Sequence, residues 1–388
     1  MRILTVLTYY RPHTSGLTIY AERLARALLR RGHQVTVLTS QFQNDLPLEE
    51  VQDGLRIRRV PVAMRISKGV IMPSLGRIAT EETRRHDALL LHLPQFDAAG
   101  LALRGRLLKK PTIIIYHSDL TLPPGLFNRL VNFVVNTMNG LAARFTHRIS
   151  SYTEDFASHS PYLRSFRKKV RVIAPAVEIP EASAAEIQEF AAQHNHEDRH
   201  PIIAMAARFA AEKGVELLIQ ALPAVLEKFP KTKVLFAGQY ENVLGEESYW
   251  ARLWPQIEKY IQAGQWEFLG TLSMQQMAAF YPNIDLFLVP STNSTETFGL
   301  VQIEAMMNGK PVVASDLPGV RQPVKLTGMG RITPIGDSAA LADNMLAVLT
   351  QPDQYRGDPS ALRQQFSPDT CAANHEALFN EIAAELKK

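Results

Sequence analysis

Two glutamates stand where this sequence could bind a ligand. Glu296 and Glu304 have seven residues between them, in a stretch (290–319) that runs from a strand-like end through a polar loop into a helical segment near Phe298. A helix that begins directly after a strand leaves free N–H groups at the edge of a sheet, and such groups bind anions. Carboxylates beside them can accept hydrogen bonds from hydroxyl groups. An anion joined to a polyol describes a nucleotide sugar.

Two basic residues follow the apolar run 202–206. Arg208 and Lys213 lie in the sequence AARFAAEKGVELL, which continues into a helical pattern. The strand-loop-helix order places both cations at the same sheet edge as the helix near Phe298. There they would hold a diphosphate and stabilise the charge that grows on it as a leaving group departs. The alternative is a solvated loop with two ordinary surface cations.

With its flanking residues, the glutamate motif resembles the donor-binding signature of the retaining glycosyltransferases of family 4, which have the two-domain GT-B fold. The order is strand, Pro-Ser, loop, Glu296, Phe-Gly-Leu, helix, Glu304-Ala-Met, and Gly-Lys-Pro-Val-Val. The stretch from Arg208 to Lys213 is similar to the family's Arg-to-Lys-Gly element, with Ala207 where a glycine is common. The alternative is an ordinary βαβ crossover with solvated glutamates.

The resemblance implies roles on the donor side. Glu296 would accept hydrogen bonds from sugar hydroxyls, and Glu304, about 6–9 Å along its helix, would bind the ribose. Gly299 would let the backbone approach the sugar and phosphate, because it has no side chain. Arg208, Lys213 and Glu296 would be catalytic. The donor would also contact Gly16, Phe298, Leu300 and a base pocket beginning at Gly270 and Thr271.

The first half of the chain carries a further candidate, His117, directly after the apolar run 112–116. Family members have a histidine at this place. The resemblance therefore implies a catalytic role for His117 in positioning the donor sugar and relaying charge to the leaving group. Alternatively, a histidine at a strand end simply caps a core. On the acceptor side we expect Tyr10 and His13, which could equally be packing residues, and Asp119, which would either orient His117 or contact the acceptor.

The resemblance also implies retention of the anomeric configuration. The sequence contains no Asp-x-Asp, so we expect no metal ion and no cofactor, with cations and helix N–H groups in their place. A UDP-sugar is the first expectation for the donor and a GDP-sugar the next. A nucleotide-sugar epimerase, or a non-catalytic nucleotide-sugar-binding protein, is the alternative function. A phosphorylase would need a pyridoxal lysine, which the sequence does not reveal.

The acceptor is expected to be lipid-linked or a saccharide. The segment 123–150 mixes apolar runs with Arg129, Arg144 and Arg148. Such a segment can lie on a membrane and deliver a lipid-linked acceptor. Alternatively, it forms a helix packed on the sheet of the first domain. We therefore expect a cytoplasmic protein with possible peripheral contact at the inner face of the cell membrane.

Composition agrees with a globular protein of two domains. The chain has 388 residues, of which 46% are hydrophobic and 21% charged, with a formal net charge of +4. The single cysteine excludes an internal disulfide. Basic residues are scattered rather than clustered with aromatic ones, so nucleic acid is not an expected partner. We see no apolar run long enough for a signal peptide or a membrane span.

Strand-like and helical runs alternate along both halves, which predicts an α/β fold of two Rossmann-like, doubly wound parallel sheets. We expect an N-terminal, acceptor-binding domain at 1–178, a linker at 179–200, and a nucleotide-sugar donor-binding domain at 201–366. In GT-B enzymes a C-terminal helix often crosses back to the first domain, so the resemblance implies the same for 367–388. Ligands of such sheets bind at the carboxyl ends of the strands.

Overall fold

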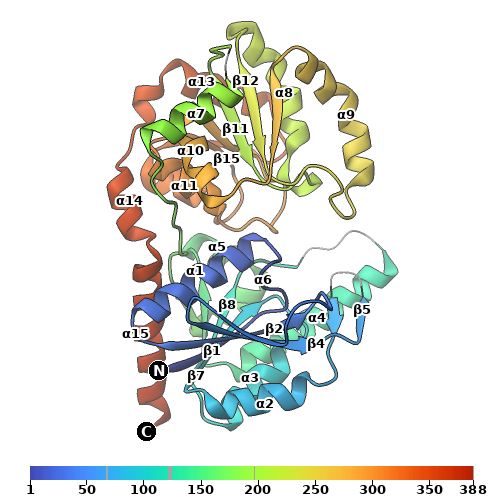
Figure 1. Ribbon diagram of the computed structural model, residues 1–388, viewed down its shortest axis with the longest axis vertical. Coiled ribbons are helices and arrows are strands. Elements are labelled where there is room, and N and C mark those ends of the chain that lie inside the picture. Colours follow the sequence, from blue (N-terminus) through green and yellow to red (C-terminus); the bar gives the residue numbers. More distant parts are fainter. Residues whose placement is uncertain (67–68, 121–124, 196, 388) are drawn as a thin grey trace. The chain divides into compact units, whose positions relative to one another are not determined.

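The computed structural model describes residues 1–66, 69–120, 125–195 and 197–387. Residues 123 and 124 of the basic and apolar segment, and residue 196 of the expected linker, lie outside the described residues. The chain divides into two compact units, Met1–Val177 with Gln365–Lys388, and Glu178–Gln364. Each unit is described by itself (Figure 1).

The first unit is built on an eight-stranded sheet in the order β10-β9-β8-β7-β1-β2-β4-β3. All described pairs in this sheet are parallel except β3 with β4. The strands are β1 (Arg2–Val6), β2 (Gln34–Gln41), β3 (Glu49–Gln52), β4 (Leu55–Pro61), β7 (Ala88–Leu93), β8 (Thr112–Tyr116), β9 (Arg148–Ser151) and β10 (Val170–Val172). A separate hairpin joins β5 (Met64–Ile66) and β6 (Gly69–Ile71).

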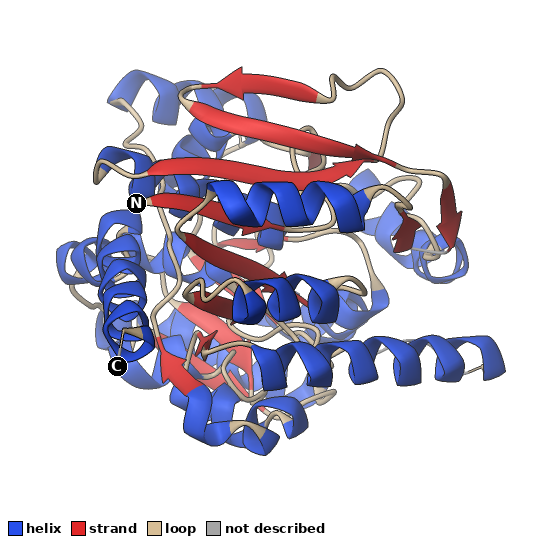
Figure 2. Cartoon of the chain, turned by 90° about the horizontal axis from the view of Figure 1, so that it is seen from below, coloured by secondary structure: helices blue, strands red, loops and turns tan. Residues whose placement is uncertain are grey.

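Helices lie against this sheet, and Figure 2 shows the neighbouring strands side by side with helices next to them. They are α1 (Gly16–Arg30), α2 (Leu75–Arg85), α3 (Ala98–Leu107), α4 (Leu126–Phe145), α5 (Glu154–His159), α6 (Pro161–Ser165), the 3-10 turn η1 (Arg167–Lys169) and α15 (Pro368–Leu386). The first helix begins where the sequence supplies a capping box, with Ser15 and Thr18 bonded reciprocally. Its apolar stripe, which includes Tyr20, Leu24 and Leu28, is buried.

The last helix, α15, belongs to the first unit and packs on α1. Its buried face includes Cys371, Leu378 and Phe379. Ion pairs extend the contact, with Arg31 Nη2 2.7 Å from Glu376 Oε2 and Arg148 Nη2 2.7 Å from Glu381 Oε1. The end of the chain is therefore part of the core of the unit that holds its beginning.

The second unit has a six-stranded sheet in the order β13-β12-β11-β14-β15-β16, parallel in every described pair. This is the Rossmann order 3-2-1-4-5-6. The strands are β11 (Ile202–Ala206), β12 (Lys233–Ala237), β13 (Trp266–Gly270), β14 (Leu286–Val289), β15 (Val312–Ser315) and β16 (Gly330–Thr333).

Helices α8, α9 and α13 cover one face of this sheet, where Leu218, Phe236 and Met345 are buried in one hydrophobic cluster. The helices of the unit are α7 (Ala184–His194), α8 (Val215–Lys228), α9 (Glu247–Gln262), α10 (Met274–Phe280), α11 (Leu300–Met307), α12 (Gln322–Thr327), α13 (Ser338–Thr350) and α14 (Pro359–Gln365), with the 3-10 turns η2 (Ala211–Lys213), η3 (Tyr281–Asn283) and η4 (Pro352–Tyr355).

Residues 179–200, expected to form a linker, belong to the second unit instead. They contain α7, which begins with a reciprocal capping box between Ser183 and Glu186. Phe190 on α7 is buried, and its ring lies 6.1 Å from that of Phe280. His194 bonds to Glu267 on β13, with 2.6 Å between Nδ1 and Oε1. Phe190 and His194 thus help to fix an otherwise polar helix to the domain.

Candidate active site

The predicted donor residues follow the two strands at which the order of the second sheet reverses. In sheets of this kind, ligands bind outside the carboxyl ends of the strands at that reversal. Here the strands are β11 and β14, which are neighbours. The loop 207–214 follows β11 and the loop 290–299 follows β14. The N–H group of Thr292 donates to the carbonyl of Glu212 at 2.9 Å, so the two loops are bonded to each other.

Lys213 and Glu296 form an ion pair across these loops. The Nζ atom of Lys213 lies 2.7 Å from Oε2 of Glu296, and the two side chains are 19% and 20% exposed. Gly214 permits this approach, because it has φ 70° and a Cβ there would lie 2.1 Å from the carbonyl oxygen of Pro290. Any side chain at 214 would separate the two loops and therefore Lys213 from Glu296.

Glu296 also contacts the start of α11. The N–H group of Gly299 donates to Oε1 of Glu296 at 2.9 Å. Burial would raise the pKa of Glu296, but the charge of Lys213 and the amides of Gly299 and Phe298 outweigh burial and hold that pKa below its usual value. The carboxylate is therefore ionised at neutral pH. Its remaining lone pairs can accept from hydroxyl groups, and Lys213 keeps two N–H donors for an anion.

The start of α11 needs a glycine. Gly299 has φ 72°, and a Cβ at this position would lie 2.9 Å from Nε2 of Gln302. Gln302, buried within α11, donates to the carbonyl of Phe298 and, at 3.0 Å, to that of Val320. Sequence reasoning missed Gln302, although a glutamine inside an apolar helical run was a readable signal of a buried polar contact.

Glu304 lies on the same helix, where it is 7% exposed. Its Oε2 accepts from the hydroxyl of Tyr281 at 2.9 Å. The structure thus ties the carboxylate to a buried tyrosine that the sequence did not single out. Its expected bond to a ribose stays a prediction.

Three other donor-side candidates lie at or after the carboxyl ends of β11 and β13. Arg208 is half exposed and bonds to the carboxylate of Glu212 at 3.3 Å. Gly270 ends β13 and Thr271 follows it, and β13 is separated from β11 by β12 in the sheet. The structure therefore brings Lys213, Glu296 and Gly299 together, and it places the expected base pocket two strands away from them in the sheet order.

In the first unit, His117 lies in a buried chain of hydrogen bonds. Its Nε2 is 2.9 Å from Nδ1 of His92, and its Nδ1 is 2.5 Å from the hydroxyl of Tyr152. Nε2 of His92 is 3.0 Å from Oγ1 of Thr5. The rings of Tyr20 and His117 are nearly perpendicular, at 82°, with centroids 5.3 Å apart. Both ring nitrogens of His117 are thus bonded within the unit.

Burial keeps both histidines of this chain neutral. It places the pKa of His117 well below the usual value and lowers the pKa of His92 to about 3. With both rings neutral, two proton arrangements satisfy all three bonds. In one, Tyr152 donates to His117, which donates to His92. In the other, every bond is reversed and the proton of Tyr152 is available to another acceptor.

The acceptor-side candidates are not gathered into one site. Tyr10, expected to face a ligand, is a core residue instead, 2% exposed and packed with Leu7, Val37 and Ile57. His13 is exposed, and its ring lies 5.1 Å from that of Tyr9. Gly16, expected to contact the donor, is the first residue of α1, and a Cβ there would meet nothing within 4 Å.

Asp119, expected to orient His117 or to contact the acceptor, is held by two hydroxyl groups. Its Oδ1 accepts from Tyr116 at 2.8 Å and from Ser160 at 2.6 Å. His117, by contrast, bonds to His92 and Tyr152. The Asp119 carboxylate therefore fixes the loop after β8 to the start of α6 rather than setting the orientation of the histidine.

A carboxyl group that the sequence did not single out lies where the order of the first sheet reverses, at β1 and β7. Asp97 lines a cavity of about 10 Å³ with Thr8, Thr39 and Gln95. The size suits about one water molecule. Burial raises the pKa of Asp97 to about 6. This carboxyl can therefore gain or lose a proton near neutral pH.

Two family profiles cover most of the chain. The profile described as Glycosyl transferases group 1 matches residues 186–365, and the one described as Glycosyl transferase 4-like domain matches residues 15–176. The chain belongs to glycosyltransferase family 4. Its two open parallel sheets are those of the GT-B fold, as the sequence predicted.

Relatives of this glycosyltransferase include a phosphatidyl-myo-inositol mannosyltransferase of Mycobacterium leprae, 25% identical over 352 residues that make up 90% of this chain and 87% of the relative. An alpha-monoglucosyldiacylglycerol synthase of Streptococcus pneumoniae is 23% identical, covering 82% of this chain and 72% of the relative. Among solved structures, Anabaena Alr3699/HepE in complex with UDP and glucose has a TM-score of 0.76 and 20% identity, covering 98% of this chain and all of that one.

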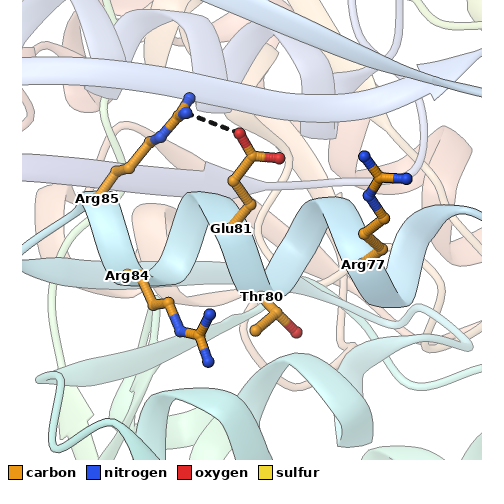
Figure 3. A pocket seen from close by; sticks show the side chains of 5 residues that line it. All are labelled: Arg77, Thr80, Glu81, Arg84 and Arg85. Atoms are coloured by element: carbon orange, nitrogen blue, oxygen red, sulfur yellow. Dashed lines mark ion pairs between the residues drawn. The ribbon is translucent and has the colours of Figure 1, made fainter.

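Other features of this glycosyltransferase lie outside the candidate site. A depression of about 460 Å³ on α2 is lined by Arg77, Thr80, Glu81, Arg84 and Arg85, and the Nη2 atom of Arg85 lies 2.7 Å from Glu81 Oε1 (Figure 3). None of these five is a predicted site residue. In the part of the chain that the structure describes, no helix has the length and apolar character needed to cross a membrane.

Proposed function

We propose that this glycosyltransferase moves a sugar from a nucleoside diphosphate-sugar to a hydroxyl group of a lipid-linked or saccharide acceptor, with retention of configuration and without a metal ion. The observation that carries the proposal is the pair of Lys213 and Glu296 at the reversal between β11 and β14, with Glu296 bonded to Gly299 at the start of α11. A cation, a carboxylate and a helix start suit a diphosphate joined to a sugar.

In the proposed reaction, the acceptor oxygen bonds to the anomeric carbon of the sugar as the bond from that carbon to the diphosphate breaks. The diphosphate leaves with the bonding electron pair, and the acceptor proton passes to it. Lys213 and Arg208 stabilise the leaving anion, and Glu296 accepts from sugar hydroxyls. Removing one such contact typically raises the barrier by about 2–4 kcal/mol. Retention is proposed from family membership.

We propose a UDP-sugar as the first donor to test and a GDP-sugar as the next. The structural neighbour crystallised with UDP and glucose supports the first choice. The names of two relatives, which contain phosphatidyl-myo-inositol and diacylglycerol, support a lipid acceptor.

A thermal-shift panel of UDP-, GDP- and ADP-sugars tests the donor directly. One nucleotide series should raise the melting temperature, because a ligand that binds only the folded state stabilises it by mass action. Lys213→Ala should abolish that shift, whereas Lys228→Ala, on exposed α8 surface, should not. Absence of a shift with every nucleotide would remove the proposed site.

Product analysis separates transfer from the alternatives. Proton NMR of the product should show the anomeric configuration of the donor, and an excess of chelator should leave the rate unchanged. Inversion would contradict the proposed stereochemistry, and loss of activity with chelator would contradict the absence of a metal. Conversion of the donor sugar without an acceptor would indicate an epimerase, and binding without any product a non-catalytic protein.

A further inference from the structure

Helix α4 presents large apolar side chains to solvent. Leu126, Phe127, Leu130 and Phe133 are 84%, 55%, 60% and 69% exposed. All four lie in the first half of the helix, whereas its buried residues, Asn139, Ala142 and Ala143, lie in the second half. Single exposed apolar residues are common on proteins, but four on one helix form a patch that calls for a partner.

The patch occupies the outer face of the helix. At about 100° per residue, Leu126, Leu130 and Phe133 lie within about 60° of one another, and the buried residues lie on the opposite side. Asn128, Asn132 and Asn139 fall on that inner side. An ordinary surface helix turns its polar side chains outward and its apolar ones inward. Here the arrangement is reversed over the first half of α4.

The charge of the chain segment that contains this helix restricts what can cover it. Residues 54–153 contain 15 Lys and Arg and five Asp and Glu, a formal charge of +10, although the whole chain carries only +4. Residues 120–153, which include α4, contain no Asp or Glu. A second copy of the chain would bring two such basic regions together, which is unfavourable. A lipid bilayer with anionic head groups matches both the apolar patch and the positive charge, because its interior is apolar and its surface is negatively charged.

We propose that the outer face of α4 inserts into a bilayer that contains anionic lipids, at the depth of the head groups and first methylenes. Helices that lie in a membrane interface bury an apolar face there while basic residues contact anionic head groups. Arg129, also exposed, flanks the patch and supplies one such contact. The proposed partner is a lipid surface. Binding to it requires neither a bound sugar donor nor sugar transfer.

Vesicle sedimentation with the intact protein tests the proposal. Wild-type protein should sediment with vesicles of phosphatidylcholine and phosphatidylglycerol, and more weakly with phosphatidylcholine alone. Phe127→Ser with Phe133→Ser should lower the partition coefficient at least ten-fold, because each change removes a large apolar area. Arg129→Gln should lower it roughly five-fold on anionic vesicles only. The matched control is Leu244→Ser with Leu326→Ser, exposed apolar residues of the second unit, which should leave it unchanged.

Phe127→Trp gives a second readout that does not require loss of binding. Its fluorescence, measured as the change against wild-type protein, should shift to the blue when anionic vesicles are added. Wild-type protein that ignores both vesicle types, or an equal effect of the control pair, would overturn the proposal. So would light scattering that shows a wild-type dimer and a monomeric double variant. If vesicle binding fails while UDP- or GDP-sugar turnover persists, this inference falls and the proposed function stands.

Discussion

The charges of Lys213 and Glu296 are compensated mainly by each other rather than by solvent. Each is about four-fifths buried, and their charged atoms are 2.7 Å apart. Removing one partner of such a pair leaves the other charge buried without compensation. Changes at either residue therefore affect ligand binding and local stability together, and the two effects must be measured separately.

We expect Lys213→Ala to weaken nucleoside diphosphate binding at least ten-fold, because the phosphates lose a charged donor. Glu296→Gln should lower kcat by roughly 10²–10³ while the fold survives, if the carboxylate acts mainly in the transition state. Calorimetry measures the first change and steady-state kinetics the second. Unaltered affinity would remove Lys213 from the site, and unchanged turnover would remove Glu296.

Tyr152→Phe tests the buried chain around His117. The variant removes the hydroxyl that bonds to Nδ1 of His117, and an unpaired buried nitrogen typically lowers stability by about 1–3 kcal/mol. Nitrogen NMR of the imidazole rings should show a changed proton distribution on His117 and His92. His117 signals identical to wild type would mean that Tyr152 does not set that distribution.

At this scale the sequence predicted that Lys213 and Glu296 lie near each other, because both follow strands and a parallel sheet brings strand ends to one edge, and the structure pairs them. It did not reveal His92 or Tyr152 as partners of His117. Those contacts join β7, β8 and the turn after β9, and only the order of the sheet makes these three neighbours. The prediction for Tyr10 was wrong for a different reason. Its position after β1 does not indicate whether its ring points to a ligand or into the core.

Among the elements, α11 has the most specific sequence requirement. The residue before it, Gly299, has a left-handed backbone conformation that favours glycine. We expect Gly299→Ala to weaken nucleoside diphosphate binding, because the new Cβ would strain the backbone and press on Gln302. Gly309→Ala is the matched control. Gly309 has the same φ of 72°, and a Cβ there would meet nothing within 4 Å.

Both glycine variants should lose about 1–2 kcal/mol of folding free energy from backbone strain, measured by urea unfolding. Only Gly299→Ala should also change ligand affinity, measured by calorimetry. Equal affinities in the two variants would show that the start of α11 does not contact the ligand.

Most strands were predictable from short apolar runs between turn residues, as for β1, β8, β11 and β14. The antiparallel strand β3 and the hairpin of β5 and β6 were not, because their side chains are mostly exposed and show no apolar alternation. The polar composition of 179–200 indicated a linker that could hold one short helix, and it obscured the bounds of α7. Its start was nevertheless readable, since Ser183 followed three residues later by Glu186 is a capping-box pattern.

At the scale of the whole molecule, the first unit should be sensitive to acid. Burial lowers the pKa of His92 to about 3 and that of His375 to about 4, and it also lowers the pKa of His117. Between these values and the ordinary pKa near 6.5, the unfolded chain binds more protons than the folded one. Stability is therefore complete above about pH 6.5 and falls as the pH decreases.

The loss should reach roughly 1 kcal/mol per pH unit for each of these histidines. Urea unfolding midpoints between pH 7.5 and 5 measure it. His375→Gln should make the dependence on pH less steep, and His159→Gln, at an exposed position, should not. Midpoints that do not change over this range would contradict the prediction.

The division into two sheets followed from the alternation of runs along the chain, and a C-terminal helix was expected at 367–388. Which sheet receives that helix did not follow from the residues, because its apolar face fits any apolar groove. The structure assigns it to α1, through the buried face around Phe379 and the pairs of Arg31 and Arg148 with its glutamates.

This placement has a consequence for synthesis on the ribosome. The second unit can close as soon as residue 364 has left the exit tunnel, whereas the first must wait for α15, made last. We therefore expect chains truncated after residue 364 and released from the ribosome to contain a protease-resistant second unit and a protease-sensitive first one. Adding α15 as a separate peptide should restore resistance, and truncated chains that already resist cleavage throughout would contradict this order of assembly.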